Sequence, residues 1–243
     1  MDHVTGDGIR LHVETHGSDA NPTVVLTHGL AASTAMWDGL VPVWVRRGLR
    51  VVAYDARAHG RSDAPHGADH YGDARMAQDL IELVGVFASP EAVAVGYSMG
   101  AAITLKALES GLDVRRAVVG AAAPAVLSWS EADDQMRAAA VAGLRGEPGA
   151  SEGTRVWASS LAMGGTDLVA MADLLEGHKP VVEHWDRIRI PVTVLAGDND
   201  VLAAPASEVA ARLAHATVVP LAGDHFSAFA GETFIDAVVD AAS

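Results

Sequence analysis

One serine, with a glycine two residues before it and another two residues after it, could carry out covalent chemistry. Ser98 is the centre of Gly96-Tyr97-Ser98-Met99-Gly100, with an apolar run before it and an alanine-rich stretch after it. This context predicts a strand that turns sharply into a helix and exposes the serine hydroxyl at the turn. The flanking glycines allow strand and helix to approach closely, and the helix N-terminus favours negative charge on the reacting oxygen. Ser98 is therefore a candidate nucleophile.

A serine hydroxyl reacts well only when a base removes its proton and an acid orients that base. His225 follows the last valine-rich run, where a loop opens the final helical stretch, and is the predicted base. Asp198 and Asp200, after another such run, are the candidate acids, although Asp-Asn after glycine also suits an ordinary turn. Asp224 is adjacent to His225 in sequence and is not expected to reach the far nitrogen of its ring.

Acyl transfer also needs two N–H groups aimed at the oxygen that becomes negatively charged. A predicted strand ends in His28-Gly29-Leu30, which would bring backbone close to the serine. The backbone N–H groups of Leu30 and Met99 are the candidates for this oxyanion hole. Gly29 would permit the close approach, and His28 is expected to support the loop by hydrogen bonding rather than to react.

The remaining histidines and carboxylates do not predict a metal site. His66, Asp69, His70 and Asp73 share a polar segment, but no single helix or strand presents them together, so a solvated loop is the better interpretation. The absence of cysteine excludes disulfides, thiol catalysis and thiolate ligands. We expect no metal and no cofactor.

Charge and composition restrict the possible partners. A formal net charge of −14 argues against nucleic acid and anionic lipid, and a hydrophobic content of 50% predicts a folded globule. The first eight residues lack the pattern of a signal peptide, and the apolar run 117–127 is too short to span a bilayer. The expected partner is a small molecule, the expected location is cytoplasmic, and the oligomeric state cannot be predicted.

Short valine-rich runs alternate with longer amphipathic stretches, which is the pattern of buried parallel strands joined by helices. An antiparallel pair through residues 9–14 would complete the edge of the sheet. The predicted strands are 23–27, 50–54, 92–96, 117–121, 192–196 and 217–221. Apolar residues that recur every three or four positions predict helices at 35–47, 73–87, 99–110, 205–214 and 226–242.

No valine-rich strand is predicted between residues 124 and 186, where three helical patterns occur at 131–144, 154–163 and 167–176. We therefore predict a core domain of residues 1–123 and 187–243 with a helical cap at 124–186. Aromatic and methionine side chains in the cap could face a substrate, although packing between cap and sheet is the more frequent role of such residues. The candidates for the pocket are Trp129, Trp157, Met163, Met171 and Leu175.

Several motifs together resemble the α/β-hydrolase superfamily, in its small esterase, lactonase and carbon–carbon-bond hydrolase branch. The resemblance implies an α/β fold with a mostly parallel eight-stranded sheet flanked by helices and a small helical cap. It also implies the order Ser98, Asp200, His225, and it favours Asp200 over Asp198 because the family's acid falls three residues after the glycine that ends the strand. The motifs are His28-Gly29, Trp37, Asp55-Ala56-Arg57-Ala58-His59-Gly60-Arg61-Ser62, the serine turn, Gly197 to Asp200 and Gly223 to His225.

One position departs from the family pattern. Relatives commonly read Asp-x-Arg-Gly-His-Gly-x-Ser, whereas this chain has Ala58 at the first glycine. We expect a local change of loop geometry without effect on catalysis, because the segment is expected to support the edge of the sheet and not to touch substrate.

The resemblance implies a serine hydrolase that cleaves a small hydrophobic carboxylic ester or lactone through an acyl-enzyme intermediate. A carbon–carbon bond hydrolase and a cofactor-free perhydrolase would use the same triad and are alternatives. A ligand-binding protein without activity is a weaker alternative, because no triad member is missing. Ser98 at the turn excludes the aspartate nucleophile of dehalogenases and epoxide hydrolases.

Overall fold

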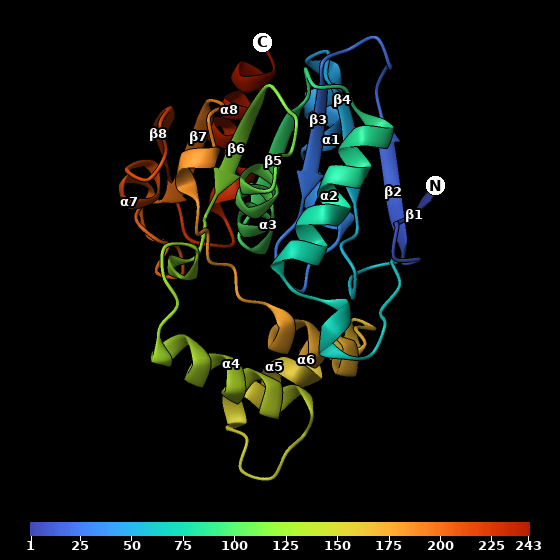
Figure 1. Cartoon of the computed structure of the whole chain (residues 1–243), viewed down its shortest axis with the longest axis vertical. Coiled ribbons are helices and arrows are strands. Elements are labelled where there is room, and N and C mark those ends of the chain that lie inside the picture. Colours follow the sequence, from blue (N-terminus) through green and yellow to red (C-terminus); the bar gives the residue numbers. More distant parts are fainter.

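The strands of the computed structural model, which describes residues 1–243, form one sheet in the order β1-β2-β4-β3-β5-β6-β7-β8 (Figure 1). β1 pairs antiparallel with β2 and β2 with β4, whereas all other pairs are parallel. The α/β class and the mostly parallel eight-stranded sheet predicted from the sequence are confirmed. The strands are β1 (Asp2–Val4), β2 (Arg10–His16), β3 (Thr23–Thr27), β4 (Arg50–Tyr54), β5 (Val93–Tyr97), β6 (Arg116–Gly120), β7 (Val192–Gly197) and β8 (Ala216–Leu221).

Helices cover both faces of the sheet, which explains why its strands are continuous apolar runs. Successive side chains of a strand point to opposite faces. Val25 therefore belongs to the larger core cluster, under α2 (Asp73–Phe87) and α3 (Met99–Glu109), while Val24 belongs to the cluster under α1 (Val41–Arg46) and α8 (Glu232–Ala242). Trp37, Trp44 and Phe234 fill the second cluster.

Three predicted helices are shorter in the structure. The stretch 35–47 divides into a 3₁₀ turn (Thr34–Trp37) and α1, in which a proline in the first turn starts a new helix. The stretch 226–242 divides at Gly231, whose extended backbone separates a 3₁₀ turn from α8, and α7 covers only Ala206–Ala210. Apolar periodicity ran through these breaks because the pieces on both sides bury the same face.

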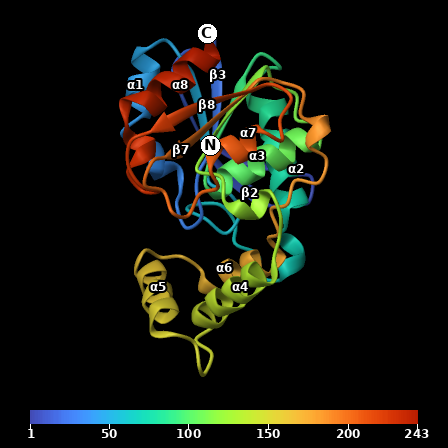
Figure 2. The same ribbon diagram turned by 90° about the vertical axis from the view of Figure 1, so that its left-hand side faces the viewer.

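Three helices between β6 and β7 form a lobe beside the carboxyl ends of the strands (Figures 1 and 2). They are α4 (Glu131–Leu144), α5 (Glu152–Met163) and α6 (Leu168–Gly177), and they share a small apolar cluster of their own. α6 contacts the 3₁₀ turn Ala68–His70 of the core, while α5 projects away from it in Figure 2. The boundaries of this lobe as a separate domain stay a prediction. None of the helices combines the length and the apolar character needed to cross a membrane.

Candidate active site

Ser98 occupies a strained turn between β5 and α3. Its φ of 56° and ψ of −116° are unusual for a residue with a side chain, which costs about 1 to 3 kcal/mol. A Cβ at Gly96 would overlap the carbonyl of Gly100, and a Cβ at Gly100 would overlap the carbonyl of Thr27. The glycines are therefore required by the packing of β5 and β3 against α3, which holds the Ser98 hydroxyl at the end of the sheet.

The structure brings Ser98, His225 and Asp200 into one hydrogen-bonded row. Ser98 Oγ lies 2.9 Å from His225 Nε2, and His225 Nδ1 lies 2.9 Å and 3.0 Å from the two carboxylate oxygens of Asp200. The Asp200 side chain is fully buried, and its Oδ1 also accepts the N–H groups of Leu202 and Ala203 at 3.0 Å. This network assigns the ring proton to Nδ1, so Nε2 is free to accept the serine proton.

The other two aspartates near the row have structural contacts. Asp198 accepts the N–H of Gly223 at 2.9 Å and so joins the loops that follow β7 and β8. Asp224 accepts hydrogen bonds from the Ser227 hydroxyl and from two backbone N–H groups, which lower the pKa of its carboxyl group. Neither carboxylate bonds to the His225 ring, as the sequence interpretation expected for Asp224.

The candidate oxyanion hole lies beside the serine. A Cβ at Gly29 would be 3.4 Å from Ser98 Cβ, so the loop after β3 passes directly over the serine. The Leu30 N–H donates no hydrogen bond within the protein, and Met99 is the first residue of α3, where an N–H has no intrahelical acceptor. The Leu30 side chain packs against both the core and the cap cluster.

Two buried histidines, one of them overlooked in the sequence, support this loop. His28 Nε2 accepts the Ala56 N–H at 3.0 Å, and its Nδ1 bonds to a backbone carbonyl of its own loop. His59 Nε2 accepts the Ala31 N–H at 3.0 Å, and its Nδ1 lies 3.0 Å from the Arg57 carbonyl. Burial lowers the pKa of both rings, to about 3 for His59. The only sequence signal for His59 was its place in a family motif.

The same motif carries two further supports. The Asp55 carboxylate accepts the N–H groups of Thr34 at 2.7 Å and Arg61 at 2.8 Å, and a Cβ at Gly60 would overlap that carboxylate. Ala58, where relatives carry glycine, has a φ of 67° in the left-handed region. Ala58 is thus held in a conformation that favours glycine, and the expected change of loop geometry stays a prediction.

Arg57 of this motif is the centre of a buried ionic group. Its side chain is 1% exposed and lies 2.6 Å from Asp79 and 3.1 Å from Asp7. Burial raises the pKa of Asp79 to about 6 in spite of this partner. Burial also opposes the charge of Asp7, but hydrogen bonds from Thr5 and Arg57 outweigh it and lower the pKa of Asp7 to about 2.

The pocket residues predicted in the cap have different surroundings. Met171 is fully buried in the cap cluster, against which Trp157 and Leu175 pack. Trp129 lies under the charged groups of Arg137 and Lys179, 5.2 Å and 5.5 Å from its ring. Met163 is 90% exposed at the end of α5, which argues against its place in an enclosed pocket. The packing alternative fits Met171.

The polar segment that contains His66 and Asp73 is not simply a solvated loop. His66 Nε2 lies 3.0 Å from Asp167, and the buried carboxylate of Asp73 lies 2.6 Å from His178 Nδ1. Both partners, Asp167 and His178, lie in the predicted cap 124–186, so the segment joins cap and core. The interpretation as a solvated loop fits His66, Asp69 and His70, which are exposed, and is wrong for Asp73, because a contact about 100 residues away leaves no local pattern.

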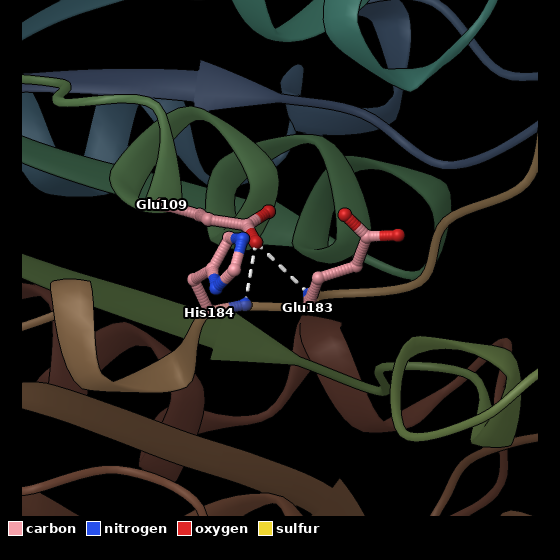
Figure 3. Close-up of side chains that lie close together, drawn as sticks. All are labelled: Glu109, Glu183 and His184. Atoms are coloured by element: carbon pink, nitrogen blue, oxygen red, sulfur yellow. Dashed lines mark hydrogen bonds between the residues drawn. The ribbon is translucent and has the colours of Figure 1, made fainter.

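A second group with metal-ligand chemistry was not predicted. Ligand atoms of Glu109, Glu183 and His184 lie within 4.8 Å of one another. Figure 3 shows that the Glu109 carboxylate already accepts the backbone N–H groups of Glu183 and His184, at 2.9 Å and 2.6 Å. The Glu109 carboxylate also pairs with Lys106 at 2.7 Å. Glu109 lies at the end of α3, about 15 Å along the helix from Ser98. The group fastens the chain that returns from the cap.

Known proteins match both the sequence and the fold. The probable oxidoreductase EphD of Mycobacterium tuberculosis is 40% identical over 89 residues, which cover 37% of this chain and 15% of that protein. The chain spans 15% to 36% of the length of the first curated relatives it matches.

Two solved structures match along almost the whole chain. A hydrolase from Pseudomonas aeruginosa PA01 is 25% identical with a TM-score of 0.80, over 99% of this chain and 97% of that chain. The enol-lactonase from Burkholderia xenovorans LB400 is 23% identical with a TM-score of 0.78, over 99% of both chains. A family model described as alpha/beta hydrolase fold matches residues 22–156, more than half of the sequence. This chain therefore belongs to the alpha/beta hydrolase fold family.

Proposed function

We propose that this chain is a serine hydrolase that cleaves small carboxylic esters or lactones through an acyl-enzyme. The observation that carries the proposal is the row from Ser98 Oγ through His225 to Asp200, with distances of 2.9 Å at both steps. A buried carboxylate, a histidine and a serine on a strained turn are the groups that nucleophilic acyl transfer needs. The similarity to an enol-lactonase supports an ester or lactone as the substrate class.

The geometry supports a two-step reaction. Ser98 Oγ attacks the acyl carbon while His225 Nε2 takes its proton, and the negatively charged oxygen is held by the N–H groups of Leu30 and Met99. His225 then gives the proton to the leaving alcohol, and the Asp200 carboxylate stabilises the imidazolium in between. A water molecule then attacks the acyl-enzyme with the same proton transfers through His225, which releases the acid and restores Ser98. In a lactone the alcohol and the acid are parts of one product.

The proposal is tested with the purified chain and a series of p-nitrophenyl esters and lactones of increasing size. We expect turnover of short esters or lactones and labelling by a fluorophosphonate, and Ser98→Ala should lower kcat by about 10⁴-fold or more and prevent labelling. Ser159→Ala, at an exposed serine of α5, is the matched control and should retain both. Equal rates for wild type and Ser98→Ala, without labelling, would overturn the proposal.

The alternatives are tested by adding a diketone, hydrogen peroxide with acetate, and small ligands to the same screen. Cleavage of a diketone without ester turnover would indicate a carbon–carbon bond hydrolase, and formation of peracid from hydrogen peroxide and acetate would indicate a perhydrolase. Binding of a small ligand without labelling of Ser98 would indicate a protein that uses the fold without catalysis.

A further inference from the structure

The two peptide groups on either side of the Leu30 α-carbon are each held by a different histidine. The Gly29 carbonyl belongs to the peptide that precedes Leu30, and it lies 2.8 Å from Nδ1 of His28. The Ala31 N–H belongs to the peptide that follows Leu30, and it donates to Nε2 of His59 at 3.0 Å. Leu30 is thus fixed from both sides, while its own N–H donates no hydrogen bond in the protein.

This arrangement determines where the Leu30 N–H points. In a trans peptide the C=O and the N–H point in opposite directions. The Gly29 carbonyl also accepts the Ala32 N–H at 3.2 Å. Because His28 and this N–H fix the carbonyl on one side, the Leu30 N–H must point to the other. The following peptide could still rotate and tilt this N–H, because the left-handed φ of 59° at Ala31 is unfavourable for an alanine. The bond to His59 opposes that relaxation.

Both rings can play this part only when they are neutral. Each Nε2 accepts a backbone N–H, so the single ring proton must be on Nδ1, from which each ring donates to a carbonyl, Gly29 for His28 and Arg57 for His59. The rings are fully buried and packed edge to face, with centroids 5.0 Å apart. Burial, followed by the neighbouring His28 ring, lowers the pKa of His59 to about 3. The Ala31 bond therefore persists over the whole range in which a hydrolase would work.

We propose that His59 is a positioning residue of the oxyanion hole: its bond to the Ala31 N–H keeps the Leu30 N–H aimed at the oxygen of an acyl group on Ser98. The inference rests on the proposed function, because the hole matters only if Ser98 transfers acyl groups. It assigns to the motif from Asp55 to Ser62 a part in transition-state binding, in addition to support of the sheet edge. The hydrogen bonds of the His59 ring go to Ala31 and Arg57 and not to Ser98, so His59 acts through the loop.

Two amide variants separate the two nitrogens of His59. In His59→Gln the side-chain oxygen can occupy the place of Nε2 and accept the Ala31 N–H. In His59→Asn the amide reaches only the place of Nδ1, so the bond to Arg57 can persist while the Ala31 N–H loses its acceptor. Both variants remove the imidazole ring, and each keeps one of its two hydrogen bonds: His59→Gln the bond to Ala31, and His59→Asn the bond to Arg57.

The assay follows kcat, KM and inhibition by a trifluoromethyl ketone, which adds to a serine and forms an oxyanion. For His59→Asn we expect kcat to fall about 10-fold to 100-fold, part of the loss known for removal of a whole oxyanion donor, with KM within about twofold. Inhibition by the ketone should weaken by a similar factor. His59→Gln should recover most of the loss in both. Equal losses in the two variants, or a loss confined to KM, would overturn the proposal.

Hydrogen exchange of the wild-type protein gives a test that does not depend on how a variant folds. The Ala31 N–H should exchange at least about 100-fold more slowly than the Leu30 N–H, because only the former has an acceptor. Equally fast exchange of the two amides would contradict the proposal. A wild-type protein without turnover would refute the proposed function instead, whereas an active wild type with an unimpaired His59→Asn would refute only the role of His59.

Discussion

Replacing Asp200 with asparagine removes the charge of the proposed triad acid and leaves its shape. The two oxygens of Asp200 are not equivalent, because Oδ1 accepts the N–H groups of both Leu202 and Ala203 at 3.0 Å. An amide NH₂ cannot replace an acceptor of two N–H groups, so the asparagine oxygen must take the place of Oδ1. Its NH₂ then lies where Oδ2 was, 2.9 Å from His225 Nδ1.

That orientation forces the wrong tautomer on His225. Nδ1 also lies 3.0 Å from the Oδ1 position, but that oxygen already accepts two N–H groups. The NH₂ group therefore donates to Nδ1, so the ring proton moves to Nε2 and points at Ser98 Oγ, which can no longer transfer its own proton. We expect kcat/KM for a short p-nitrophenyl ester to fall about 10⁴-fold, or about 5.5 kcal/mol in transition-state stabilisation. The thermal unfolding temperature should change little, since both loop hydrogen bonds are kept.

The matched control is Asp198→Asn, two residues away in the same loop. The contact of Asp198 with the Gly223 N–H requires only an acceptor oxygen, which asparagine retains. Activity of this variant should remain within about threefold of wild type, because neutral acceptors replace charged ones at a cost of about 1 kcal/mol at most here. An Asp200→Asn protein that keeps more than a tenth of the wild-type kcat/KM would refute the assigned role of Asp200.

Three further predictions concern the supports of the site. Gly60→Ala should lower the free energy of unfolding, measured in urea, by about 2 kcal/mol or more, because the φ of 53° is left-handed and the added Cβ would overlap Asp55. The control Gly85→Ala, on the open face of α2, should raise the free energy of unfolding by about 0.5 to 1 kcal/mol. The pKa of Asp7 is lowered from 3.8 to about 2, so its charge stabilises the fold above about pH 4, and the stability difference between wild type and Asp7→Asn should shrink between pH 4 and pH 2; a difference that grows on acidification would contradict this. Met163→Ser should change kcat/KM less than twofold, because the side chain is 90% exposed, and a larger fall would restore it to the pocket.

The parts of the molecule that follow from local pattern were predicted well. The strands through Val25 and Val95 are buried on both faces, so apolar runs predict their bounds within about a residue. The turn at Ser98 is predicted by the two flanking glycines, which the packing requires. The helix at 226–242 was predicted too long because Phe226, which is exposed beside His225, fits the apolar spacing of the helix but lies outside its helical backbone.

The parts that depend on contacts distant in sequence could not be predicted. His59 and Ala31 are 28 residues apart, and only the folded sheet, in which β3 and β4 are parallel neighbours, brings the loops after these strands together. The surroundings of Trp129 and Met163 likewise depend on how three short helices pack, which apolar spacing does not determine. The substrate pocket is for this reason the least predictable part of the site.

The cap leaves and re-enters the core at one place. The Val182 N–H, after the last cap helix α6, donates to the carbonyl of Val126, before the first cap helix α4, at 3.1 Å, while Glu109 holds the residues that follow. β6 and β7 pair directly whatever lies between them. A segment whose two ends already touch can be replaced by one of another length without stretching its host. The cap is thus an interchangeable module: an ancestor could have acquired a new substrate by exchange of this lobe, and a protein engineer could graft another cap here with the row from Ser98 to Asp200 left in place.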